Sequence, residues 1–357
     1  MAQYILKRLL LMIPTLIGIL FINFTILQFV PGGPVDTFKA RISGEADFIG
    51  AGTGGAASVG GDQTNSQSQA DTAAIEKFKA DYGLDKPFLQ RFGIMVVKYA
   101  QFDFGYPMFK NTSVSVLDQI KQRLPVSIAL GLWSTLIIYL ISIPLGIAKA
   151  VREGSKFDTY SSALIILAYA LPSIILPVML RMYFAGGADW GYFPLRGLQA
   201  DNYDTLSAWG KVKDYVWHVT LPVISMTVAG FATKTILTKN SFLDEIKKQY
   251  VMTARAKGLS ENRILYGHVF RNAMLIIISG FPAIFVAVFF TGSFIVEQTF
   301  SLNGLGLLGL EAVFERDYPI IMGTLFIFSL IGLAVHLLAD LTYILVDPRI
   351  DFEARNS

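Results

Sequence analysis

The sequence predicts an all-α polytopic membrane protein with six transmembrane helices and an extracytoplasmic insert after the first. Apolar residues make up 53% of the 357 residues and charged residues only 16%, whereas about a quarter of the residues in a soluble protein are charged. The apolar residues gather in six runs, each long enough to cross a hydrocarbon core of about 30 Å. Basic residues concentrate in alternate loops between these runs.

The first run extends from Leu9 to Val30 and follows the basic pair Lys7 and Arg8. A basic start before an apolar segment is also typical of a secretory signal peptide. This run is longer than the core of a signal peptide, and it has no small-residue cleavage site before Pro31. We therefore interpret residues 1–30 as a retained transmembrane helix whose N-terminus is cytoplasmic.

We predict that residues 31–124 form a periplasmic insert. A Gly/Ser/Gln/Ala tract at about 50–74 has the composition of a disordered segment. After this tract, helix-forming composition runs from Ala74 to Tyr82, and a second amphipathic helix is predicted from Phe88 to Phe102. The insert is either a spacer or a docking surface for a partner that delivers substrate.

We predict that residues 125–347 form a five-helix core, followed by a cytoplasmic tail at 348–357. By the positive-inside rule, the basic loops at 149–156 and 239–272 and the tail lie in the cytoplasm, as does the N-terminus. Prolines interrupt several spans, and neighbouring helices can accommodate them at membrane depth. The five apolar runs are Val126–Ala148, Thr159–Phe184, Trp217–Thr238, Ala273–Val296 and Pro319–Val346.

The cytoplasmic loop at 239–272 is predicted to form a helix, a break and a second helix. Good helix formers continue to Lys257, and Gly258 is the residue type that ends a helix with a positive φ. Ser260 can cap a second helix that runs through Phe270. This helical hairpin could lie against a partner protein, or it could be only a basic loop that obeys the positive-inside rule.

Tyr250-Val251-x-Thr253-Ala254-Arg255-Ala256-Lys257-Gly258-Leu259-Ser260 resembles the cytoplasmic loop of ABC-importer permeases of the dipeptide and oligopeptide branch. The general importer pattern is Glu-Ala-Ala, three residues, then Gly. Here Met252 and Thr253 replace the Glu and the first Ala, while Ala254 and Gly258 are retained. Further segments similar to this family cover nearly the full length: 31–36, 102–105, 124–127, 193–197, 218–222, 268–273 and 346–353.

The resemblance implies a type I ABC-importer permease core in the bacterial inner membrane. Its partners would be a second homologous permease subunit, two ATPase domains or subunits and a periplasmic peptide-binding protein. Runs 131–139, 238–245 and 300–309 are most similar to a branch that imports oligopeptides and microcin C, a peptide-nucleotide antibiotic. The residues implied to couple to the ATPase are Tyr250, Thr253, Ala254, Arg255, Ala256, Lys257, Gly258, Leu259 and Ser260.

Gly304-x-Gly306-x-x-Gly309 matches the dinucleotide-binding fingerprint, but it follows a membrane span and opens no βαβ unit. We therefore reject a nucleotide role for these glycines. With the preceding Glu297, they resemble the extracytoplasmic turn before the last span of peptide permeases. We predict Glu297, Asn303 and Gly304 as residues of the outer mouth or the pathway.

The sequence predicts no catalytic, cofactor-binding or metal-binding residue in this chain. It contains no G-x-x-x-x-G-K-[ST] loop, so ATP and Mg²⁺ are expected on partner subunits. It contains no cysteine, and its three histidines are too scattered for a metal site. The small net charge of +3 gives no reason to expect nucleic acid as a partner.

One alternative is a self-sufficient proton-coupled peptide carrier. His336 and Asp340 are four residues apart, hence on one helix face, and ionisable residues inside spans are functional candidates. Lys234 is another such residue, although it is close enough to the inner end of its span to snorkel. The segment from Asp340 to Arg349 also resembles the closing motif of the permease family, which implies a structural role.

Overall fold

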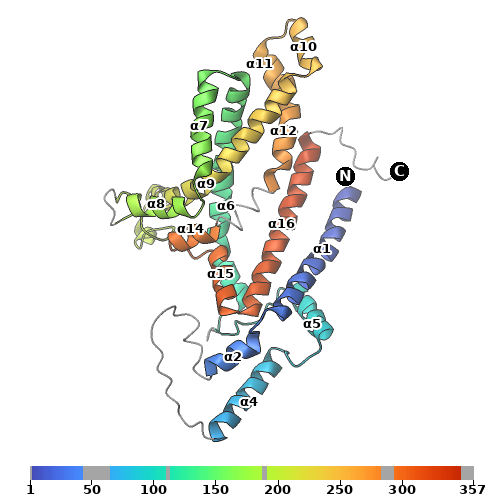
Figure 1. The fold of residues 1–357 in the computed structure, drawn as a ribbon, viewed down its shortest axis with the longest axis vertical. Helices are drawn as coiled ribbons and strands as arrows, with labels where there is room; N and C mark the ends of the chain where they lie inside the picture. Colours follow the sequence, from blue (N-terminus) through green and yellow to red (C-terminus); the bar gives the residue numbers. More distant parts are fainter. Residues whose placement is uncertain (1, 43–64, 110–112, 187–190, 283–292, 347–357) are drawn as a thin grey trace. The chain divides into compact units, whose positions relative to one another are not determined.

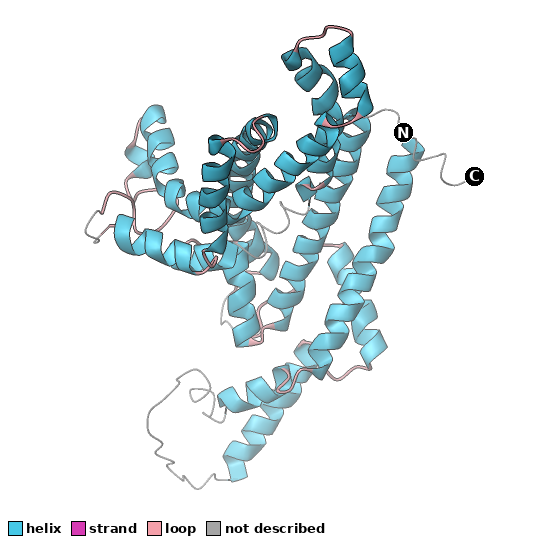
Figure 2. Ribbon diagram, turned by 45° about the horizontal axis from the view of Figure 1, so that its top comes forward, coloured by secondary structure: helices cyan, strands magenta, loops and turns pink. Residues whose placement is uncertain are grey.

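The computed structural model describes residues 2–42, 65–109, 113–186, 191–282 and 293–346. These residues are helical, with one isolated bridge between Ala185 and Phe193 and no strand among the ranges given (Figure 2). The all-α prediction is confirmed. The chain divides into two compact units, which we call the core unit (residues 1–9, 122–308 and 330–357) and the insert unit (residues 10–121 and 309–329).

The insert unit contains most of α1 (Ala2–Phe29), together with α2 (Pro34–Ile42), α4 (Asn65–Asp81) and α5 (Phe88–Ala100) (Figure 1). Stacked rings of Phe38 and Phe78, with centroids 4.1 Å apart, join α2 to α4. Proline supplies the first residue of α2, where its missing N–H removes no hydrogen bond.

The helices predicted after the low-complexity tract are confirmed as α4 and α5. Helix α4 begins at Asn65, nine residues before the helix start predicted at Ala74, and so overlaps, over residues 65–74, the tract for which disorder is predicted. That segment is rich in Gln and Ala, and it continues without a break into the stronger helix formers after residue 74. Residues 50–64 lie outside the described part of the chain.

The core unit is built on long helices. They are α6 (Val116–Val151), α7 (Lys156–Ala170), α8 (Ile175–Phe184), α9 (Ala208–Ile246) and α16 (Tyr318–Val346), of which α6 and α16 begin in the insert unit. Shorter elements are the 3₁₀ helix η1 (Tyr203–Thr205), α12 (Phe270–Ser279), α14 (Ser293–Thr299) and α15 (Leu305–Glu315). One buried apolar cluster joins the middle of α6 and α9 to α14, and a second joins their far ends to α12.

Three described helices are long and apolar enough to cross a membrane: α1 over Ile5–Phe29, α6, and α16 over Tyr318–Thr342. Two bent pairs pass the same test, α7 with α8 at 96° and the two parts of α9 at 49°. The remaining predicted span, Ala273–Val296, includes residues outside the described part of the chain. The count of six spans therefore stays a prediction.

The predicted span Thr159–Phe184 is not one straight helix. Leu171, which ends α7, has the extended backbone that a residue before proline prefers. Pro172 follows, and it has no N–H with which to continue the helix. The apolar run is continuous in sequence, but the chain turns sharply at this proline.

Candidate functional site

The predicted coupling segment begins where α9 ends at Ile246. Lys248 is extended and precedes α10 (Gln249–Ala256), so the chain turns before the short helix begins. Glu245 accepts a hydrogen bond from Lys248 and another from the Tyr250 hydroxyl at 2.7 Å. Burial, and then the bond to Glu245, raise the pKa of Tyr250 to about 12. The hydroxyl stays protonated at physiological pH and keeps donating to Glu245.

Asn272 extends this anchor to the next long helix. Its side-chain amide donates to the Tyr250 hydroxyl at 3.3 Å. The start of α10 is therefore joined to the end of α9 and to α12 by one polar chain of Glu245, Tyr250 and Asn272. Tyr250 was predicted as a coupling residue, and the structure places it at the anchor.

Gly258 ends α10 in the left-handed conformation, with φ of +78°, as the sequence predicts. Its N–H donates to the Arg255 carbonyl at 2.9 Å, and the Leu259 N–H donates to the Ala254 carbonyl at 3.3 Å. These two bonds define a Schellman motif. Leu259 packs against the apolar cluster that joins α6, α9 and α12, and this contact completes the motif.

An ion pair spans the turn after α10. Arg255 donates two hydrogen bonds to Glu261, at 2.7 and 3.0 Å. This bonding lowers the pKa of Glu261, so the pair is charged at neutral pH. Glu261 is the first residue of α11 (Glu261–Ile264), which continues through the π-helical turn η2 (Leu265–Val269) into α12. Ser260 occupies the N-cap position, but its side chain makes no capping bond.

Helix α10 has one buried face and one exposed face. Val251 and Ala254 are buried in the cluster formed with Phe242, Ile264 and Val269. Met252 is 64% exposed, and Thr253, Arg255, Ala256 and Lys257 are exposed with it. These five residues form what we call the outer face of α10.

Ala254 is one of the residues implied to couple to the ATPase, yet its side chain is only 9% exposed and packs in its own core. A small residue is needed at this position because α10 lies close to the helices beneath it. The outer face of α10 is the part of the segment that a partner can reach.

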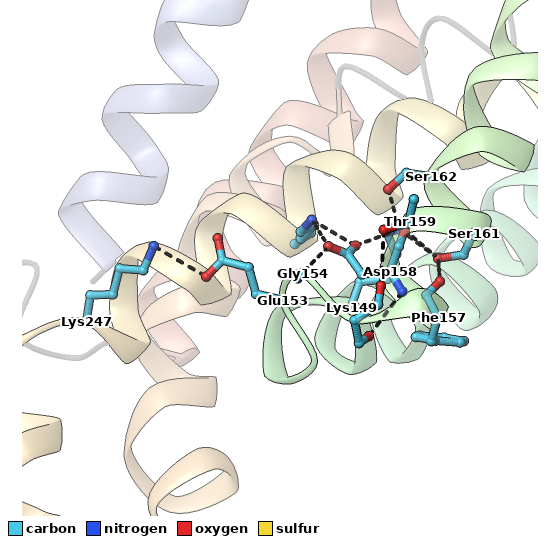
Figure 3. A network of polar contacts seen from close by, with 11 residues as sticks. Lys149, Glu153, Gly154, Phe157, Asp158, Thr159, Ser161, Ser162 and Lys247 are labelled. Carbon is cyan, nitrogen blue, oxygen red and sulfur yellow. Dashed lines mark hydrogen bonds and ion pairs between the residues drawn. The ribbon is translucent and has the colours of Figure 1, made fainter.

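A buried ionic network lies near the same end of the core unit (Figure 3). The Lys149 ammonium on α6 lies 2.9 Å from the Asp158 carboxylate and also donates to the hydroxyls of Ser161 and Ser162, both at 2.7 Å. Lys239 on α9 donates to both Asp158 oxygens, at 2.8 and 2.7 Å. One carboxylate therefore joins three long helices.

This network was not predicted from the sequence. The signal that was present is Ser155-x-x-Asp158, in which the Ser155 hydroxyl accepts from the Asp158 N–H at 3.3 Å to cap α7. That signal marks the start of a helix. It does not reveal that Asp158 meets a lysine 81 residues away.

The residues predicted at the outer mouth are divided between buried and exposed positions. Glu297 is fully buried, and its carboxylate accepts from the Ser127 hydroxyl at 2.8 Å and from the Leu307 N–H at 2.7 Å. Gly304 is also buried, and a Cβ there would overlap the Glu297 carboxyl group. Asn303 is exposed.

Glu297 therefore caps the N-terminus of α15, where a negative charge is favourable. Gly304, Gly306 and Gly309 belong to this helix start and its first turns. This arrangement agrees with the rejection of a dinucleotide site. The prediction that Glu297, Asn303 and Gly304 contribute to the pathway remains untested.

Asp340 forms an ion pair with Arg8 of α1, with atoms 3.0 Å apart, and both residues belong to the core unit. The relay proposed for the alternative function would need Asp340 to exchange protons with His336, which is exposed. Among the described residues, no group of three His, Cys, Asp or Glu could hold a metal ion.

Comparison with known proteins identifies the class. Residues 142–352 match the family described as binding-protein-dependent transport system inner membrane component. That match covers more than half of the chain. The chain belongs to this family, and it is a type I ABC-importer permease subunit of the inner membrane, a kind of subunit that carries no catalytic activity.

Full-length relatives place it among the peptide-transport permeases. It is 54% identical to the peptidoglycan transport system permease protein YejB of Agrobacterium fabrum, over 100% of both chains. It is 54% identical to the inner membrane ABC transporter permease protein YejB of Escherichia coli O157:H7, over 99% of this chain and 100% of the other. It is 34% identical to the oligopeptide transport system permease protein AppB of Bacillus subtilis, over 99% and 100%.

Proposed function

We propose that this chain forms half of a transmembrane pathway for oligopeptides and that the outer face of α10 receives an ATPase subunit. The proposal rests on the way in which α10 is held at both ends while one face stays exposed. The helix is anchored at its start by Glu245, Tyr250 and Asn272, and it is closed at its end by the Gly258 turn. Its outer face is exposed and is left for a partner.

The partners in this proposal are a second homologous permease subunit, two ATPase domains or subunits and a periplasmic peptide-binding protein. ATP and Mg²⁺ bind only the ATPase partners. Closure of the ATPases on ATP moves α10, and the spans change from outward to inward opening. Both termini lie in the cytoplasm, so reporter fusions at Asp62 and Ser357 should report opposite sides of the membrane. Fusions that report the same side would contradict this orientation.

Oligopeptides are the proposed substrates, including peptide-nucleotides of the microcin C type. A second candidate is a peptide derived from peptidoglycan, because the Agrobacterium relative is named for peptidoglycan transport. Both substrates present a peptide backbone, and the described residues include no site that selects one of them.

The test is a deletion strain complemented with this gene. Cells that carry the gene should take up labelled oligopeptide and become sensitive to microcin C, and they should lose both properties when the ATPase gene is removed. Uptake that survives loss of the ATPase and collapses with a proton uncoupler would instead support the carrier alternative. Labelled peptidoglycan fragments in the same strains separate the two substrate candidates.

A further inference from the structure

Helix α5 of the insert unit packs against the part of α1 that should lie inside the bilayer (Figure 1). The rings of Phe88 and Phe92 contact those of Phe21 and Phe24, with centroids 5.2 to 6.1 Å apart. The apolar stretch of α1 ends at Phe29. At a rise of 1.5 Å per residue, Phe24 and Phe21 lie about 8 and 12 Å inside that end. Helix α5 therefore meets α1 at a depth where lipid surrounds the span.

The beginning of α16 gives the same depth. Phe326 contacts the rings of Tyr99 and Phe104, with centroids 5.6 and 5.5 Å away. The apolar stretch of α16 begins at Tyr318, so Phe326 lies about 12 Å inside it. Two spans therefore place the end of α5 and the following turn below the membrane surface.

A second side of α5 carries exposed apolar residues next to the polar Gln90. Leu89 and Val97 are 71% and 60% exposed, and they lie eight residues apart on one face with Gly93 between them. A helix that is apolar on two sides is stable inside a protein or in a lipid interface. This exposed face belongs in lipid.

A cavity of about 570 Å³ lies beside α5, within the insert unit. Its volume is in the range of small-molecule sites, about 300 to 1,000 Å³. Arg91 donates to the Gln28 side chain at 2.9 Å and lies over the Phe24 ring, which leaves other guanidinium N–H groups available. The charged residues of the lining are Lys86, Arg91, Lys98 and Asp103, so the lining is net positive.

The two basic residues of α5 lie on one face. Arg91 and Lys98 are seven residues apart, and Met95 lies between them on the same side of the helix. Apolar lining is supplied by Phe24, Ile94 and Met322. The cavity thus offers two cations next to an apolar wall. Arg91 is bonded to Gln28, one residue from the end of the apolar stretch of α1, so its guanidinium lies where phospholipid headgroups meet the hydrocarbon core.

We propose that α5 is embedded in the leaflet at the Phe29 end of α1, and that this cavity binds the headgroup of an anionic phospholipid. Arg91 and Lys98 hold the phosphate, because charge-assisted hydrogen bonds from these side chains are strong. The acyl chains pass Ile94, an apolar residue of the cavity lining that is 37% exposed. In the orientation proposed above, this is the periplasmic leaflet.

The affinity test uses the full-length chain with the subunits that co-purify with it, in nanodiscs of phosphatidylcholine. Native mass spectrometry measures binding of added phosphatidylglycerol. Arg91→Gln and Lys98→Ala should each weaken binding about tenfold, as expected for loss of one charge-assisted hydrogen bond. Lys77→Ala is the matched control, because Lys77 is an exposed lysine of the insert unit that does not line the cavity.

Competition with inorganic phosphate shows whether the cavity binds a lipid headgroup or free phosphate. Inorganic phosphate shares the headgroup charge but leaves the apolar wall unfilled, so an equal concentration should not displace phosphatidylglycerol. Displacement by phosphate, or equal affinity in Lys98→Ala and Lys77→Ala, would overturn the proposal. Lys98 is exposed, so its replacement should leave the fold intact.

The depth test uses single cysteines, because the chain contains none of its own. Spin labels at Leu89→Cys and Val97→Cys should be relaxed by oxygen in the lipid and protected from a water-soluble nickel reagent. A label at Lys77→Cys should show the opposite pattern. If the labels on α5 are relaxed by the nickel reagent, the helix lies in water. If they are shielded from both reagents, a protein partner covers the helix. Either result would reject the lipid site.

Discussion

Replacement of Gly258 tests whether the coupling segment must keep its shape. Gly258 has φ of +78°, and a Cβ at this position would meet nothing within 4 Å. The cost of a side chain therefore comes from the backbone alone, about 1–2 kcal/mol for Ala and more for the β-branched Val. Asn tolerates this conformation better, so Gly258→Asn should be the mildest change.

The expected loss follows from that cost. A penalty of 1–2 kcal/mol changes an equilibrium by about 5- to 30-fold. If the hairpin becomes ordered only when the ATPase binds, the affinity should fall by this factor, with Val worse than Ala and Ala worse than Asn. A quantitative pull-down of the ATPase measures the affinity, and peptide-stimulated ATP hydrolysis measures the coupling.

Gly154 provides the matched control. It has φ of +73°, a Cβ there would likewise meet nothing within 4 Å, and it lies in the turn between α6 and α7. Gly154→Ala should carry the same backbone cost, measured as thermal unfolding, with ATPase binding retained. Equal ATPase binding by Gly258→Val and the unmodified chain would refute the reasoning. Equal losses of ATPase binding in the Gly258 and Gly154 variants would show that general instability, and not the shape of the hairpin, causes the loss.

Three further predictions concern the rest of the core unit. Met252→Arg should block ATPase binding with normal folding, whereas Ala254→Arg should lower the unfolding temperature, because residue 254 is buried; the reverse pattern would contradict the assignment of the two faces. Asp158→Asn leaves two lysines without their anion and should cost about 3–5 kcal/mol of unfolding free energy. Glu153→Gln removes an exposed pair with Lys247 and should cost at most about 1 kcal/mol; similar costs in the two variants would count against the network. Gly304→Ala and Glu297→Gln should each cost about 1–3 kcal/mol and should not add in the double variant, because position 304 contacts Glu297. A change in substrate preference without a loss of stability would instead favour the pathway role predicted for these residues.

Local rules predict α10 well because its geometry is set locally. The Gly258 turn needs a residue that accepts a positive φ, and both of its hydrogen bonds join residues within six positions. The same holds for α1 and α16, in which long apolar composition alone specifies the helix. The family resemblance carried by residues 250–260 was likewise readable from the sequence, and the comparisons confirm it.

Contacts between distant segments could not be predicted in this way. Lys149 and Lys239 were interpreted as basic residues at the inner ends of spans, and nothing in their spacing indicates that they share Asp158. Ala254 was included among the coupling residues, and its burial could not be predicted because a small residue fits close packing against either a partner or its own core. Prolines were expected to interrupt several spans, but the sequence does not indicate that the bend at Pro172 reaches 96°.

The described contacts suggest how movement of α10 would reach the spans in the proposed function. Glu245 and Asn272 hold Tyr250 from two long helices, so a displacement of α10 pulls on the ends of α9 and α12 together. Lys239, further along α9, is bonded through Asp158 to Lys149 on α6. Since separating a buried charged pair is costly, α9 and the α6–α7 hairpin should move as one body. The proline-marked bend after Leu171 is then the nearest point at which this body can change its angle to α8.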